Sequence, residues 1–211
     1  MVVNGRGRAE GTEMEERQHN IPQLINFALA TGLVVTVGDA VQNLIQEANP
    51  AEPVGLPNFV LLALMFAVAV KVFMDEHDML RDGKIRPYII LDVVFLVASY
   101  CTLIAACTLV RNFEYSVVLI GWYFGILAAW NLTAILLDWS RAPLNVEAGK
   151  HRLILIWLGI DVFAALLFFL ACDRYDLKVE GQVQVIFLLA LLLIGDFVVS
   201  PTGTYKYSKN T

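Results

Sequence analysis

Charged residues are scarce in this chain, and their scarcity is the first guide to its class. Only 17% of the 211 residues are Asp, Glu, Lys or Arg, whereas 58% are hydrophobic. A typical soluble domain has about 25% charged residues. This composition argues against an ordinary water-soluble domain, and most of the chain is expected to face lipid or other helices. The net charge of −5 gives no support for a nucleic-acid partner.

Cysteine and histidine are also rare. The three cysteines have no CxxC spacing, so the sequence predicts neither a zinc site nor a disulfide framework. The three histidines, His19, His77 and His151, all lie outside the apolar segments. Their positions exclude haem held by paired histidines inside a helix bundle, and an intramembrane protease of the Ser/His type. No catalytic residue, metal or cofactor is expected, and an enzymatic role is not favoured.

Long apolar segments dominate the rest of the chain. A membrane-spanning helix needs about 20 mainly apolar residues. Six segments approach this length, separated by short polar stretches that carry Pro, Gly or charges: 21–45, 56–74, 88–110, 115–139, 153–172 and 183–200. The predicted fold is an all-α polytopic membrane protein, with a six-helix transmembrane domain over residues 21–200. Residues 1–20 and 201–211 are expected to form tails.

The positive charges predict the orientation of these six helices. Cytoplasmic loops of membrane proteins are enriched in Lys and Arg. Eleven of the 15 Lys and Arg residues lie in the two tails and in the second and fourth loops. Three lie in the odd-numbered loops, and Lys71 lies within the second segment. The sequence therefore predicts that both termini are cytoplasmic, in a multi-pass protein of the plasma (inner) membrane.

Five ionisable residues lie inside the predicted spans and away from their ends: Asp39, Lys71, Asp92, Asp161 and Asp196. A charged side chain at the centre of a bilayer costs roughly 2.5–3.5 kcal/mol on insertion scales. We therefore expect all five side chains to face the interior of the protein. The topology predicts different depths for the aspartates, with Asp39 in the outer half and Asp161 close to the middle of its helix.

Acidic groups at successive depths could form a polar route for protons or cations. The predicted route contains Asp39, Asp92, Asp161 and Asp196, together with Thr36, Asn43 and Asn131. A second interpretation is that the aspartates hold neighbouring helices together. One stripe of the first predicted helix contains Gly32, Thr36, Asp39 and Asn43, with Gln42 beside it. This polar stripe could line a cavity or pack against a neighbouring subunit.

Lys71 has two possible partners in the sequence. Asp75 lies four residues further along the same helix, and the lysine could extend toward it at the cytoplasmic end. This predicts a charge pair between Lys71 and Asp75. A buried pair with Asp92 or Asp196 on another helix is the alternative.

An acidic cluster, Asp75, Glu76, Asp78 and Asp82, follows the second predicted span. It could be a solvated loop, attract cations to a cytoplasmic mouth, or bind Mg²⁺. The spacing D-x-x-D-x-x-x-D resembles the first metal-diphosphate motif of intramembrane prenyltransferases of the UbiA type, although Met74 replaces the usual Asn and no second aspartate motif is present. The resemblance covers eight residues and implies a Mg²⁺-dependent intramembrane transferase as a remote alternative.

Small residues in the fourth segment predict close helix packing. Gly121, Gly125 and Ala128 form a small face of the GxxxG type, which lets helices approach within one chain or between chains.

The leading functional hypothesis is an ion-conducting protein, a channel or simple transporter for protons or cations, embedded in the lipid bilayer. Because small membrane proteins often build pores on a symmetry axis, a homo-oligomer is expected. The second hypothesis is a membrane-embedded interaction or sensor subunit that docks a cytoplasmic protein partner through its inner loops.

Overall fold

The computed structural model describes residues 6–46, 55–81, 89–141, 148–174 and 179–199. These residues form helices and contain no strand, so the all-α prediction is confirmed for them. The described helices are α1 (Arg6–Gln46), α2 (Leu56–Arg81), α3 (Ile89–Thr108), α4 (Phe113–Arg141), α5 (Ala148–Arg174) and α6 (Val179–Val199).

Four of these helices are long and apolar enough to cross a membrane, which fits a transmembrane protein. The apolar stretches within α5 and α6 are shorter over the described residues, at Leu155–Ala171 and Gly181–Gly195. The four long stretches are Leu24–Ile45, Leu56–Met74, Ile90–Thr108 and Phe113–Leu137.

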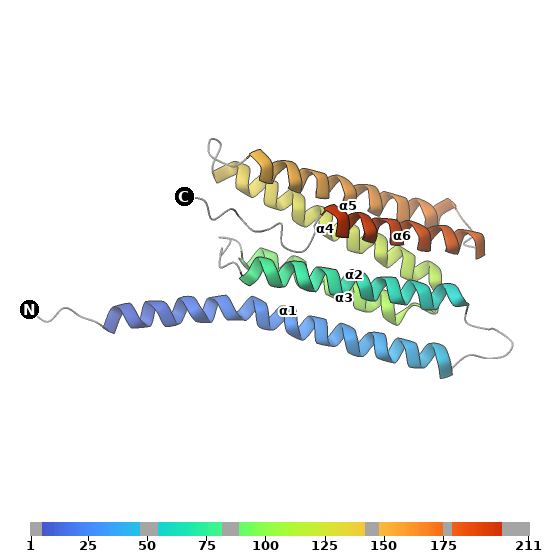
Figure 1. The fold of residues 1–211 in the computed structure, drawn as a ribbon, viewed down its shortest axis with the longest axis horizontal. Helices are drawn as coiled ribbons and strands as arrows, with labels where there is room; N and C mark the ends of the chain where they lie inside the picture. Colours follow the sequence, from blue (N-terminus) through green and yellow to red (C-terminus); the bar gives the residue numbers. More distant parts are fainter. Residues whose placement is uncertain (1–5, 47–54, 82–88, 142–147, 175–178, 200–211) are drawn as a thin grey trace, which may run out of the picture.

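The helices run alternately in opposite directions, side by side (Figure 1). α4 and α5 make the most extensive contact, and α4 also packs on α3. α1 packs mainly on α2 and α3, at the edge of the bundle, while α6 packs on α2. α1 and α6 therefore each leave a side of the helix open in the described bundle.

The first helix begins at Arg6, before the apolar segment predicted to start at residue 21. Its first turns project beyond the other helices (Figure 1). These turns are polar, and hydropathy detects only the apolar part of a helix. The stretch expected to be a tail thus continues the helical backbone of α1.

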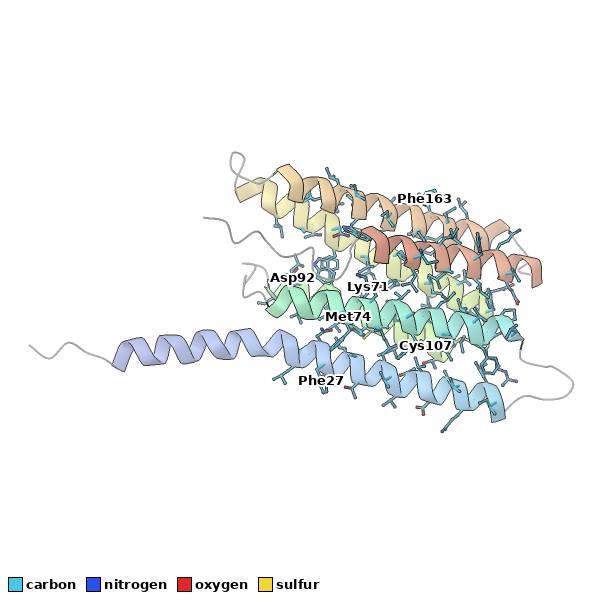
Figure 2. All side chains as sticks on the ribbon, in the orientation of Figure 1. Phe27, Lys71, Met74, Asp92, Cys107 and Phe163 are labelled. Carbon is cyan, nitrogen blue, oxygen red and sulfur yellow. The ribbon has the colours of Figure 1, made fainter. Side chains whose placement is uncertain are left out.

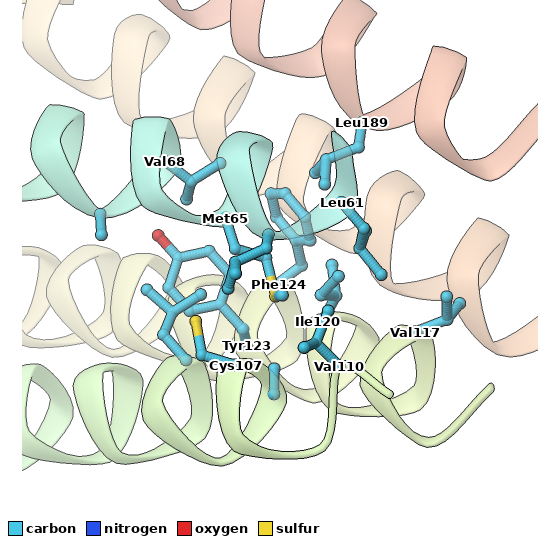
Figure 3. Close-up of a cluster of buried hydrophobic side chains, with 14 of the residues drawn as sticks. Leu61, Met65, Val68, Cys107, Val110, Val117, Ile120, Tyr123, Phe124 and Leu189 are labelled. Atoms are coloured by element: carbon cyan, nitrogen blue, oxygen red, sulfur yellow. The ribbon is translucent and has the colours of Figure 1, made fainter. Parts of the chain in front are cut away.

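The centre of the bundle is apolar. Figure 3 shows side chains from α2, α3, α4 and α6 meeting there. They surround a small hollow that has no room for a water molecule. Its lining consists of Met65, Val68, Leu103, Ile120, Tyr123, Phe124 and Leu189. At this level of the described bundle, a single chain holds a dry core.

Gly121 determines how closely α4 approaches α5. A Cβ atom built on Gly121 would lie 3.3 Å from both Cβ of Phe168 and Cε1 of Phe169. Gly125 differs, because a Cβ atom there would meet nothing within 4 Å. Ala128 is buried, with 8% exposure. Of the two glycines in the predicted packing face, Gly121 is the one pressed against α5.

The turn between α3 and α4 is fastened to the start of α2. Nδ2 of Asn58 donates hydrogen bonds to the carbonyl oxygens of Val110, at 2.7 Å, and Arg111, at 3.3 Å. Ser116 adds a hydrogen bond of 2.9 Å to the carbonyl oxygen of Ala106. Since carbonyls at a helix C-terminus lack partners within the helix, these side chains satisfy groups that would otherwise need water.

Candidate functional site

Asp161 on α5 is the most deeply buried carboxylate among the described residues, with 5% of its surface exposed. Its Oδ2 atom accepts a hydrogen bond of 2.8 Å from Nδ2 of Asn131 on α4. The structure therefore brings together two residues of the predicted polar route. A carboxylate and an amide provide several oxygen atoms that can accept hydrogen bonds or contact a cation.

Asp92, in the first turn of α3, has a different partner on α4. Nε1 of Trp130 donates a hydrogen bond of 2.8 Å to Oδ1 of Asp92. The indole also stacks on Phe95, with ring centroids 6.1 Å apart and planes at 6°. An indole nitrogen can only donate, so this contact suits an acceptor oxygen of the carboxyl group.

Trp130 and Asn131 are consecutive residues of α4. Successive residues of a helix point about 100° apart, so the two side chains reach two different neighbouring helices. Trp130 contacts Asp92 on α3, and Asn131 contacts Asp161 on α5. α4 thus connects the two aspartates through neighbouring positions, and we call Asp92, Trp130, Asn131 and Asp161 the α4 bridge.

Lys71 on α2 is buried, with 1% exposure. It takes part in a polar interaction within the structure. Figure 2 shows Lys71 and Asp92 in the half of the bundle where α2 ends and α3 begins. The side chain of Asp75 lies outside the described residues, so the predicted pair between Lys71 and Asp75 stays a prediction.

The predicted route residues on α1 lie elsewhere. Asp39 and Asn43 are exposed on the surface of α1. Thr36 is half-buried, and its hydroxyl donates to the carbonyl oxygen of Gly32 at 2.9 Å. Within one chain, the structure therefore separates Asp39 and Asn43 from the α4 bridge.

Several predicted site residues fall at the limits of the described structure. Asp75, Glu76 and Asp78 belong to the last turns of α2, but nothing is described of their side chains. Asp82 lies outside the described residues, and the side chain of Asp196 on α6 does too. Among the side chains that are described, no group of three His, Cys, Asp or Glu residues could hold a metal ion.

One buried polar contact was not predicted from the sequence. The hydroxyl of Tyr100 on α3 donates a hydrogen bond of 3.1 Å to Oδ1 of Asn26 on α1. Both residues are buried, with exposures of 0% and 1%. An isolated Asn within an apolar segment was the available signal, since such residues commonly bond across helices.

The buried polar side chains of the described bundle all have hydrogen-bond partners. No buried side-chain nitrogen or oxygen atom there lacks a hydrogen-bond partner. Comparison of the chain with family models, curated proteins and solved structures gives no match. Function is therefore inferred from these residues alone.

The α4 bridge has two chemical capabilities. Its carboxylates could bind and release protons or contact a desolvated cation. They could also hold α3, α4 and α5 together through hydrogen bonds. Substitutions that change the charge and keep the hydrogen bond distinguish these two roles.

Proposed function

We propose that this chain is an integral membrane protein that conducts protons or cations, as a channel or simple transporter. In this proposal all six helices span a plasma membrane, with both termini in the cytoplasm. The observation that carries the proposal is the buried carboxyl of Asp161, 5% exposed and bonded to Asn131. An ionisable group at membrane depth is costly, and ion pathways and proton relays are among the functions that use one.

Asp92 provides the second site in this proposal. It lies in the first turn of α3, on the cytoplasmic side in the proposed topology, whereas Asp161 lies deeper. A proton or cation would pass between sites whose oxygen atoms replace part of its lost hydration. The indole of Trp130 and the amide of Asn131 hold the two carboxyls in position.

The apolar hollow lined by Met65, Tyr123 and Leu189 has no room for a water molecule. A cation cannot cross an apolar region without water or polar ligands. In our proposal, a route that passed through this hollow would require it to open, as in proteins that alternate access between two sides. We therefore propose a gated channel or transporter in place of a permanently open pore.

Flux measurements in liposomes test the proposal. The variant Asp92→Asn/Asp161→Asn keeps oxygen acceptors for Trp130 and Asn131 while removing both titratable groups. We expect proton or cation flux to fall to the level of protein-free liposomes. Glu114→Gln, which neutralises an exposed carboxyl at the start of α4, is the matched control and should retain flux. Wild-type flux no higher than that of empty liposomes, or full flux in the double variant, would show that the proposal is wrong.

A membrane-embedded interaction or sensor subunit is the second candidate. Asp92 and Asp161 each accept a hydrogen bond from α4, donated by Trp130 and Asn131. This candidate is favoured because such bonds are expected of residues that hold helices together. In this case a cytoplasmic protein would dock on the acidic end of α2. Neutralising Asp75, Glu76 and Asp78 together should abolish co-purification of that partner, and wild-type liposomes should show no flux.

A further inference from the structure

One face of α1 is buried against the bundle, and the opposite face is open. Leu33, Ala40 and Leu44 are buried, with exposures of 2%, 5% and 2%. They face α2 and α3, the main packing partners of α1. Figure 2 shows Phe27 projecting from α1 on the side away from the other helices. Most large side chains on the open surface of α1 are apolar, as on a membrane-facing helix, but polar side chains interrupt them.

Six exposed residues share one side of the helix, within an arc of about 100°, and the exposed Leu24 precedes them on the same side. We call them the α1 stripe: Ala28, Thr31, Val35, Gly38, Asp39 and Gln42. Their positions lie about 180° around the helix from Leu33, Ala40 and Leu44. The stripe contains three polar side chains, Thr31, Asp39 and Gln42, and the small residues Ala28 and Gly38.

The stripe lies within Leu24–Ile45, the part of α1 that is long and apolar enough to cross a membrane. Lipid tails offer no partner to a carboxyl or an amide group, so such side chains face protein or water-filled space. Thr31 needs no outside partner, because its hydroxyl bonds to the carbonyl oxygen of Phe27 at 2.8 Å. Asp39 and Gln42 are therefore the residues of the stripe that require a cover, and the exposed Asn43 lies beside them.

We infer that the α1 stripe is covered by the same stripe of a second copy of this chain. The stripe is self-complementary, since Asp39 accepts hydrogen bonds and the amide of Gln42, three residues away, donates them. Two copies inserted in the same direction and related by a two-fold axis bring Asp39 of each copy beside Gln42 of the other. The inference rests on α1 crossing a membrane and does not depend on ion conduction.

Gly38 permits the close approach that this pairing needs. A Cβ atom built on Gly38 meets nothing within 4 Å, so the chain itself gives no packing reason for glycine there. Small residues at helix crossings in membranes let two backbones come together. Between paired stripes, the absence of a side chain at Gly38 brings the polar groups of both helices within reach.

The substitution Gly38→Leu tests the interface without disturbing the described packing of one chain. Its matched control is Gly159→Leu on α5, which is also exposed and also has nothing within 4 Å of a built Cβ atom. We expect wild-type protein and Gly159→Leu to be dimers by light scattering in detergent and by energy transfer between labelled copies in liposomes. Gly38→Leu should weaken the dimer by roughly tenfold or more.

Disulfide cross-linking gives a second reading of the same surface. In a background of Cys101→Ser, Cys107→Ala and Cys172→Ala, Val35→Cys should cross-link between copies under mild oxidation. Phe163→Cys, at an exposed position on α5, should not cross-link under the same conditions. A monomeric wild-type protein, an undiminished dimer in Gly38→Leu, or cross-linking at Phe163→Cys but not at Val35→Cys would overturn the inference.

Discussion

Nδ2 of Asn131 on α4 lies 2.8 Å from Oδ2 of Asp161 on α5. The contact joins the two helices that pack together most extensively. It also involves a titratable group that is buried, because Asp161 is only 5% exposed. This hydrogen bond is therefore placed to hold α4 against α5, and in the proposed function it also positions the carboxyl group for an ion.

Asp161→Leu should destabilise the protein, whereas Asp161→Asn should not. Leucine leaves the part-buried Asn131 amide without its acceptor, which costs about 1–2 kcal/mol. Asparagine keeps an oxygen acceptor at the same place. Reversible unfolding in mixed detergent measures the difference. Val162→Leu, at an exposed neighbouring position, is the control and should match wild type. Equal stability of the Leu and Asn variants would contradict a stabilising bond between Asn131 and Asp161.

Trp130→Phe should remove the hydrogen bond to Asp92 and keep the stacking on Phe95. Phenylalanine retains an aromatic ring against Phe95 but lacks the indole N–H donor. A double-mutant cycle with Asp92→Leu should give a coupling of about 0.5–1.5 kcal/mol. The control cycle pairs Asp92→Leu with Leu136→Ala, at an exposed position of α4. This control cycle should give no coupling free energy. A coupling of zero for Trp130 and Asp92 would show that their hydrogen bond adds no stability.

The sequence predicted where the second apolar helix begins and ends better than it predicted which side of a helix its polar residues occupy. The second predicted span, residues 56–74, matches the apolar stretch Leu56–Met74, because hydropathy records how long a helix remains apolar. The same measure does not report direction. Asp39 was therefore expected to face the interior of the protein, and in the described chain it lies on the open side of α1.

Partners across helices were the second feature that the sequence could not give. Asn131 and Asp161 were both candidates for the polar route, yet no spacing within one helix links residues on different helices. Trp130 was not selected, because tryptophan is common in apolar segments and its N–H group shows no pattern in sequence. Its role depends on the packing of α4 against α3, which is a property of the tertiary structure.

Gly121→Ala and Gly125→Ala form a matched pair on one side of α4. The methyl group at Gly121 would lie 3.3 Å from Cβ of Phe168 and from the ring of Phe169, so these side chains of α5 must move by a few tenths of an ångström. At Gly125 the methyl group meets nothing within 4 Å and raises helix propensity. We expect Gly121→Ala to be less stable than Gly125→Ala by about 1–3 kcal/mol in the same unfolding assay. A reversed order would show that the contact at Gly121 does not limit the packing.

Asn58→Ala should loosen the turn between α3 and α4. The substitution removes the donor to the carbonyl oxygens of Val110 and Arg111, so the turn after α3 loses its hydrogen bonds to the start of α2. Because Arg111 is exposed in this turn, trypsin reports its opening directly. We expect cleavage after Arg111 in detergent to be roughly tenfold faster than in wild type, in keeping with a loss of about 1.4 kcal/mol in local stability. Thr108→Ala, which removes an exposed hydroxyl bonded only within α3, is the control and should leave the cleavage rate unchanged. An unchanged rate in Asn58→Ala would mean that the turn is held by backbone contacts, such as the hydrogen bond of 2.8 Å from the amide of Asn112 to the carbonyl oxygen of Leu109.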